Sequence, residues 1–288
     1  MKMLQTLVLS ITVLLSIGGC KTDNSKLEML KREQSEVVEM KAINRINDIP
    51  APEGYEKIVL NENSFGSWLR LLSLRKNNTV YLYDGALKAN QSWHYRVIDI
   101  STGNKNLQQC ADAIMRLRAE YYFSQKAYDK IVFYTGDGTK MSFVNYAKGE
   151  RYAVRSNSLK SYQSGNQHEC YSHECLLSFL ENVFGYCGTY TIKDMTDLKA
   201  AVYEIAPGDV FVTAGSPGHA MMVADVAVNK KTGKKAYMLL QGFMPAQDIH
   251  IVHNLNNKSI SPWYELNPNE WVNTPGKIFA LTDLRQWR

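Results

Sequence analysis

Short apolar runs separated by turn residues dominate the pattern of hydrophobic and polar positions along the chain. Runs of roughly five to ten residues that end at Gly, Pro, Asn or Asp predict β-strands. Such runs occupy residues 55–60, 79–83, 94–100, 131–135, 141–146, 151–155, 209–213, 219–228, 235–241 and 249–253. The sequence Gly136-Asp137-Gly138-Thr139 between two of these runs predicts a hairpin. The polar segment 156–167 is expected to be a loop.

Apolar residues spaced by three or four positions predict helices at 64–73, 106–123, 172–184 and 194–202. In the second helix, Asn106 is the expected N-cap, and one apolar stripe follows it. The stripe contains Leu107, Cys110, Ala111, Ile114, Leu117 and Tyr121. Because helices come early and strands dominate late, the pattern predicts an α+β fold in which a helix packs on an antiparallel sheet.

Composition supports a globular protein. Hydrophobic residues make up 45%, aromatic residues 11% and charged residues 21%, which excludes disordered, collagen-like and coiled-coil chains. Lys and Arg exceed Asp and Glu by only 33 − 28 = 5. This small excess is spread along the chain, so no nucleic-acid partner is expected.

The first twenty residues predict export. An apolar stretch at residues 4–17 is too short to span a bilayer and is typical of a signal peptide, here residues 1–19. It ends in Ile17-Gly18-Gly19-Cys20, which resembles the lipobox of bacterial lipoproteins. That resemblance implies that Cys20 is acylated and anchors the protein in the cell envelope, at the outer membrane, on its periplasmic or surface face. The alternative is an ordinary secretory signal with an incidental cysteine.

A polar segment separates the signal from the folded part. Residues 20–48 carry alternating Lys, Arg and Glu with balanced charge and predict a tether. Pro50 and Pro52 then interrupt the chain. A single α+β domain is therefore expected at residues 49–288.

Cys110, His219 and Gln241 form the candidate catalytic set. Near a helix start, unpaired N–H groups and the helix dipole favour a thiolate, so the pKa of Cys110 is expected below its ordinary value. His219 opens a predicted strand and can take the proton, and Gln241, at the end of the next strand, can orient the imidazole. His250 competes for either role, whereas Asp225, six residues along the strand, is too distant.

Residues 207–223 resemble a sequence block of NlpC-type cell-wall cysteine peptidases and related papain-like amidases. In that family a helix-start Cys comes first, a His second and a polar residue third, an order that Cys110, His219 and Gln241 keep. Three departures are present, one of which is the separation of 109 positions between Cys110 and His219. The family's Asp-Cys-Ser-Gly type of signature is replaced by residues 108–112, Gln-Gln-Cys-Ala-Asp, and Cys110 lies a turn inside the predicted helix.

Further blocks that together cover nearly the whole mature chain resemble an uncharacterised lipoprotein family of Gram-negative bacteria, known only as a domain of unknown function. The blocks are residues 84–85 with 90–91, 107–112 with 116–121, 208–211, 217–220 and 244–250. This resemblance implies a cell-envelope lipoprotein and no particular reaction.

Other interpretations of these side chains remain open. Cys110 lies on an apolar stripe and can be a buried structural residue. Gln108 and Gln109 are either oxyanion donors or exposed first-turn residues. The set Arg116, Arg118 and Glu120 is interpreted as surface ion pairs.

Residues 168–175 contain two His and two Cys. Their close spacing suits zinc poorly, and an oxidising periplasm favours disulfides instead, so no metal or other cofactor is expected. If Cys110 stays free, Cys170, Cys175 and Cys187 form at most one disulfide and leave one thiol over.

Two functions follow from the sequence. The first is a lipid-anchored papain-like cysteine hydrolase, an amidase or peptidase that acts on cell-wall peptide. The second is a non-catalytic envelope lipoprotein that binds a peptide, a glycan or a protein partner.

Overall fold

The computed structural model describes residues 43–165 and 169–288, which belong to one compact unit, Ile43–Arg288. The expected signal peptide, Cys20 and the tether up to residue 42 lie outside the described residues, as does His168. No helix in the described ranges is long and apolar enough to cross a membrane.

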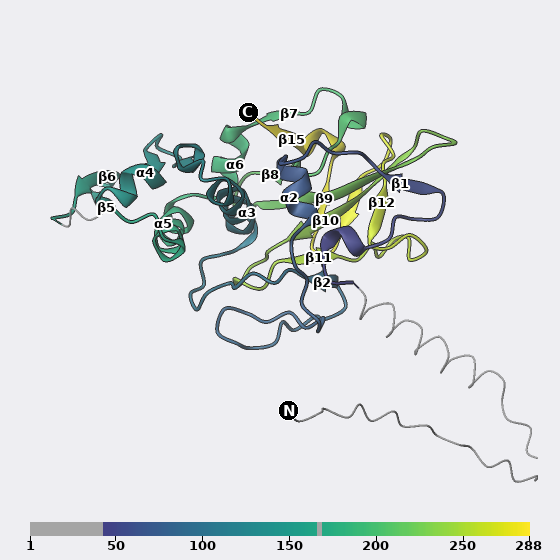
Figure 1. Ribbon diagram of the computed structural model, residues 1–288, viewed down its shortest axis with the longest axis horizontal. Helices are drawn as coiled ribbons and strands as arrows, with labels where there is room; N and C mark the ends of the chain where they lie inside the picture. Colours follow the sequence, from purple (N-terminus) through teal and green to yellow (C-terminus); the bar gives the residue numbers. More distant parts are fainter. Residues whose placement is uncertain (1–42, 166–168) are drawn as a thin grey trace, which may run out of the picture. The chain divides into compact units, whose positions relative to one another are not determined.

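A mixed α+β architecture is built around an antiparallel sheet (Figure 1). Seven of its strands follow the order β2-β11-β10-β9-β8-β15-β7 within the described residues, while β1 pairs with β9 and β12 with β10. Their bounds are β1 Tyr55–Lys57, β2 His94–Val97, β7 Thr196–Leu198, β8 Val210–Thr213, β9 His219–Asn229, β10 Lys235–Gln241, β11 His250–Val252, β12 Trp263–Glu265 and β15 Leu284–Trp287.

Strand β9 lies in the middle of the core and is buried from His219 to Ala227. Its even-numbered residues Ala220 and Met222 pack with the helix side of the sheet, whereas Met221 and Val223 join a second apolar cluster on the other face. A strand buried on both faces needs apolar residues at every position. This explains why β9 and β10 consist largely of consecutive apolar residues. The predicted strand 235–241 is the observed β10.

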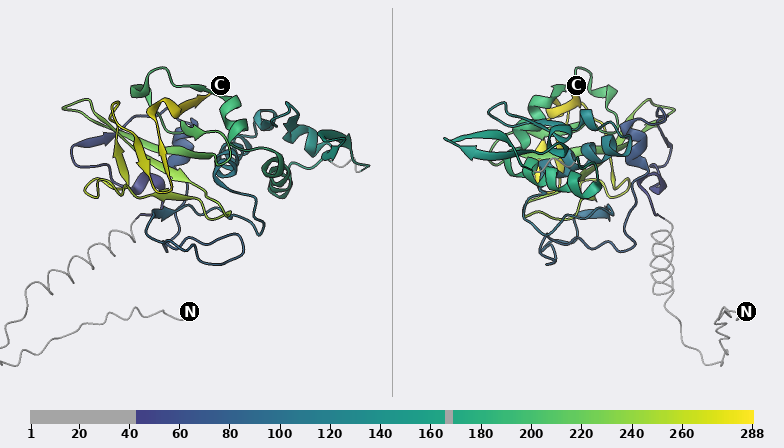
Figure 2. Two further views of the ribbon diagram at one scale, coloured as in Figure 1. Left: turned by 180° about the vertical axis from the view of Figure 1, so that it is seen from behind. Right: turned by 60° about the vertical axis from the view of Figure 1, so that its left-hand side comes forward.

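Helix α3 packs against β9 and β10. In Figures 1 and 2 it lies between the sheet and a segment formed by α4, α5 and the β5–β6 hairpin. The helices are α2 Phe65–Arg70, α3 Cys110–Ser124, α4 Phe143–Ala147, α5 His173–Tyr186 and α6 Thr189–Met195. Short 3-10 helices occur at Ile46–Asp48, Tyr128–Lys130, Val202–Glu204 and Leu281–Asp283. The two-stranded pairs are β3 Val132–Tyr134 with β4 Lys140–Ser142, β5 Glu150–Arg155 with β6 Ser158–Gln163, and β13 Val272–Thr274 with β14 Lys277–Phe279.

Several predicted elements are wrong in place or type. Residues 79–83 form only isolated bridges, and the second half of the predicted strand 141–146 is helix α4. The predicted loop 156–167 contains strand β6. The helix expected at 194–202 lies earlier, as α6, and is followed by β7.

Candidate functional site

Cys110 is the first residue of helix α3. The N-cap is Gln109, whose backbone N–H donates to Asp112 Oδ2 at 3.0 Å, as in a capping box. Asn106, the expected cap, instead accepts a hydrogen bond from the Ala246 N–H at 2.8 Å. The expectation that Cys110 lies a turn inside the helix is therefore wrong, and the thiol occupies the helix start.

Cys110 is buried, with 8% of the residue exposed. Burial raises the pKa of the thiol above its ordinary value and outweighs the nearby backbone N–H groups of Ala220 and Ala111, which act to lower it. The expected depressed pKa is thus wrong in sign for the resting protein, because the low-dielectric surroundings penalise the thiolate more than the N–H groups stabilise it.

Close packing at Gly242 holds the start of α3 against the sheet. A Cβ at this position would lie 2.7 Å from the Gln109 carbonyl oxygen and 2.9 Å from Ala113 Cβ. Only glycine permits this approach of backbone to backbone. Gly242 directly follows Gln241, so the contact brings the helix start to the end of β10.

A chain of hydrogen bonds crosses the strand ends from His219. Its Nε2 lies 2.7 Å from Gln241 Oε1, Gln241 Nε2 lies 3.3 Å from His250 Nε2, and His250 Nδ1 lies 2.8 Å from the Asp248 carbonyl oxygen. A carbonyl only accepts, so His250 Nδ1 carries the proton and His250 Nε2 accepts from the Gln241 amide. Gln241 Oε1 then accepts from His219 Nε2–H. The Nδ1 of His219 is left with a free lone pair.

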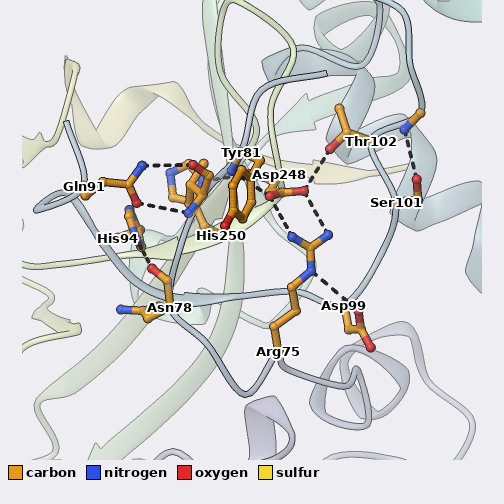
Figure 3. Close-up of polar contacts among 12 residues, drawn as sticks. Arg75, Asn78, Tyr81, Gln91, His94, Asp99, Ser101, Thr102, Asp248 and His250 are labelled. Carbon is orange, nitrogen blue, oxygen red and sulfur yellow. Dashed lines mark hydrogen bonds and ion pairs between the residues drawn. The ribbon is translucent and has the colours of Figure 1, made fainter. Parts of the chain in front are cut away.

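Asp248 fixes the far end of this chain (Figure 3). Its carboxylate accepts two hydrogen bonds from Arg75, at 2.7 and 2.9 Å, and one from the Tyr81 N–H at 2.8 Å. Burial lowers the pKa of His250 to about 3 and lowers the pKa of His219 as well. Both imidazoles are therefore neutral near pH 7, as the hydrogen-bond chain requires.

Cys110 and His219 both lie near the start of β9, but the thiol and the imidazole are on different faces of the sheet. The sulfur contacts the N–H of Ala220, the residue bonded to His219. The imidazole itself lies on the other face of the sheet, stacked on Phe279 at 6.0 Å and edge-on to Phe243 at 5.1 Å. Among the described residues, no hydrogen bond joins Cys110 Sγ to a nitrogen of His219. The two groups are adjacent through the strand backbone but not in direct contact in the resting state.

A cavity of about 500 Å³ opens beside the thiol. Cys110, Gln109 and Asp112 line it from α3, while the α5–α6 connection and the loop before β9 form the other walls. Gln108 does not line this cavity. It is buried, and its Oε1 accepts from Arg116 at 3.1 Å. Gln109 lines the cavity, with its side-chain amide donating to Asn106 Oδ1 at 3.3 Å, so of the two glutamines only Gln109 is at hand as a candidate oxyanion donor.

The walls of this cavity come from segments far apart in the chain. The lining residues are Asn106, Leu107, Gln109, Cys110, Ala111, Asp112, Phe184, Cys187, Gly188, Thr189, Tyr190, Gly215, Ser216, Pro217, Gly218 and Met244.

Asp112 is a residue of this cavity that the sequence reasoning missed. Burial raises the pKa of its carboxyl to about 7, and its Oδ1 has no hydrogen-bond partner among the described residues. Its charge acts on both Cys110 and Cys187. An Asp three residues after the N-cap is typical of a capping box and can be recognised in the sequence. The burial of this Asp cannot be recognised there.

The remaining candidates have structural roles. Cys170 and Cys175 form a disulfide, with Cα atoms 6.1 Å apart, and Cys187 stays a free thiol. Arg116 pairs with Glu120 at 2.7 Å. Within residues 43–165 and 169–288, no group of three or more His, Cys, Asp or Glu is arranged to hold a metal ion.

Cys110 lies at the start of α3, His219 at the start of β9 and Gln241 at the end of β10, while the imidazole and the thiol remain apart. Neither curated proteins nor solved structures gave a match to this chain. A family model described as "Domain of unknown function (4846)" matches residues 46–286, which include every described residue of the site. The chain belongs to this family of domains of unknown function.

Proposed function

We propose that this protein is a lipid-anchored cysteine hydrolase of the bacterial cell envelope, with a papain-like arrangement of Cys110, His219 and Gln241. The substrate class we propose is cell-wall peptide, cleaved at an amide bond. The hydrogen bond from His219 to Gln241 carries the proposal, because it leaves the lone pair of His219 Nδ1 available as a base beside the strand residue that contacts the sulfur. The envelope location rests on the lipobox that ends at Cys20.

The pKa shifts favour a neutral resting pair rather than a preformed thiolate and imidazolium. In the proposed first step, His219 Nδ1 takes the thiol proton while the sulfur forms a bond to the amide carbon. The carbonyl π electrons move to oxygen. The N–H groups at the start of α3, with the side chain of Gln109, are placed to stabilise that oxyanion.

Collapse of the tetrahedral intermediate breaks the C–N bond, and His219 returns its proton to the leaving amine. The thioester left on Cys110 is then attacked by water, whose proton goes to His219. The product acid leaves, and the proton returns to the sulfur. The His219 ring stacks on Phe279, on the face of the sheet opposite the thiol, so this step requires the imidazole to leave Phe279 and reach the sulfur around the start of β9.

One observation favours the alternative, a non-catalytic binding lipoprotein. Burial raises the pKa of Cys110, and a thiol that stays protonated and covered is typical of a structural residue. In that case the cavity beside Cys110 would hold a peptide or glycan without cleaving it.

Alkylation of the folded protein tests the proposal. Iodoacetamide labelling at pH 7.5, resolved by mass spectrometry, compares Cys110 with Cys187, a second free thiol that lines the same cavity. We expect faster reaction at Cys110, slowing by about tenfold in His219→Ala and by less in Gln241→Ala. If Cys110 reacts only on unfolding and ignores His219, the binding lipoprotein is the better account.

A further inference from the structure

A second cavity, of about 500 Å³, lies beyond the thiol site. Its walls come from the C-terminal half of α3, residues 129–140, the end of α6 and the end of β15. Four basic and two acidic side chains line it, so its formal charge is 4 − 2 = +2. They are Arg118, Lys130, Lys140 and Arg288 against Asp129 and Asp194.

Arg118 is the central feature of this cavity. Its Cζ lies 4.1 Å from the Trp287 ring centre and 5.0 Å from that of Tyr122. Nη2 donates to the Tyr122 hydroxyl at 2.8 Å, and no carboxylate pairs with the guanidinium among the described residues. Burial lowers its pKa. By contrast, Arg70 and Arg75 each hold a carboxylate at 2.7 Å.

The guanidinium therefore has unused hydrogen-bonding capacity. Of its five N–H donors, one is directed at Tyr122, and stacking on Trp287 holds the plane of the fork in a fixed orientation. Trp287 is in turn fixed by its indole N–H, which donates to the Gly208 carbonyl at 3.0 Å. A rigid, partly desolvated guanidinium is the group that recognises a carboxylate or phosphate with two parallel hydrogen bonds.

The two lysines supply further positive charge without opposing partners. Lys130 and Lys140 are exposed, line the same cavity, and have no ion pair within the described part of the chain. The charge of Arg288 is partly used, because its Nε pairs with Asp197 at 3.0 Å.

We propose that this cavity binds an anionic group, a carboxylate or a phosphate, through the fork of Arg118 with support from Lys130 and Lys140. Arg118 lies eight residues after Cys110, about 12 Å along the helix. The proposal is thus independent of the chemistry at the thiol. The exposed Tyr134, which also lines the cavity, offers a ring face to the part of the ligand that carries the anion.

Titration of the folded protein with inorganic phosphate or with acetate, at ionic strength held constant with NaCl, tests this site. The readout is the Trp287 indole signal in a proton–nitrogen correlation spectrum. We expect a saturable shift with at least one anion, and which anion saturates distinguishes a phosphate from a carboxylate ligand. Arg118→Gln is expected to weaken the apparent affinity by about tenfold or more.

Two further variants control for disturbed packing. The double change Lys130→Gln and Lys140→Gln alters only exposed side chains and is expected to weaken binding several-fold. Arg151→Gln is the matched control, because Arg151 also lies over a tyrosine ring, at 3.9 Å from Tyr146, but does not line the cavity. The proposal is overturned if neither anion gives a saturable shift up to 50 mM, on the order of the weakest specific anion sites, or if the Lys variant and wild type titrate identically.

Discussion

The change Gly242→Ala tests whether the start of α3 depends on contact with the end of β10. The added Cβ would meet the Gln109 carbonyl oxygen at 2.7 Å, whereas ordinary contact begins at 3.4 Å, so the two backbones must separate by 3.4 − 2.7 = 0.7 Å. Neither contact atom can rotate away. Overpacking of this kind costs about 1–3 kcal/mol. We therefore expect the free energy of unfolding to fall by that amount.

Gly185→Ala is the matched control. Gly185 lies inside α5, and a Cβ there meets no atom within 4 Å, so alanine should be neutral or stabilising by up to about 1 kcal/mol. Denaturant unfolding followed by circular dichroism measures both variants. In the Gly242→Ala background, His219→Ala should also change Cys110 alkylation less than in wild type, because the helix start has moved. Equal unfolding midpoints for Gly242→Ala and wild type would refute the packing argument.

Three further predictions concern charge, orientation and anchoring. The pKa of Asp112 is raised to about 7, above its unfolded value of 3.8, so the folded state binds the proton more tightly. The free energy of unfolding should therefore fall as pH rises from about 4 to 7, by about 1.4 kcal/mol per pKa unit. Asp112→Asn should flatten this pH dependence, and an unchanged profile would contradict the burial argument. His250→Phe should let the Gln241 amide turn over, so that its NH₂ group donates to His219 Nε2 and the proton of the neutral imidazole moves to Nδ1. The nitrogen chemical shifts of the His219 ring measure this change of tautomer, and unchanged shifts would show that His250 does not set it. Cys20→Ser should release the protein from the membrane fraction, and equal partitioning of both forms would remove the lipoprotein claim.

Burial on both faces made the central strands β9 and β10 predictable from the sequence pattern, whereas other buried segments, such as α4 and β12, were not predicted correctly. The range 235–241 matches β10, and 219–228 differs from β9 by one residue, because both strands are buried on each side. In the hairpin β5–β6 the first strand was predicted at 151–155, but the second was missed for the opposite reason. Its second strand is mostly exposed, and its pairing follows from the turn at Ser156 and Asn157, whose φ angles are 50° and 64°. A turn with this geometry pairs its two flanking strands even where few of their residues are hydrophobic.

The candidate site, too, was predictable from the sequence only in part. Sequence order and helix position made Cys110, His219 and Gln241 the candidate set, and the structure joins His219 to Gln241 by a hydrogen bond but not to Cys110. The sign of the thiol pKa was not predictable, since it depends on how completely the fold removes water from the sulfur. The role of His250 was also hidden, because it depends on which ring nitrogen faces the Asp248 carbonyl.

The contrast between the two free thiols argues that Cys110 is more than a buried apolar residue. Cys187 Sγ donates to the Tyr134 carbonyl at 3.8 Å, and burial raises the pKa of Cys187 to about 12, although the Thr191 hydroxyl lies beside it. A thiol that donates to a carbonyl is stabilised in its protonated form. At Cys110 burial also raises the pKa, but nearby backbone N–H groups, including that of Ala220, oppose this shift because they favour negative charge on sulfur. In the proposed mechanism these N–H groups would stabilise the sulfur as it loses its proton during attack.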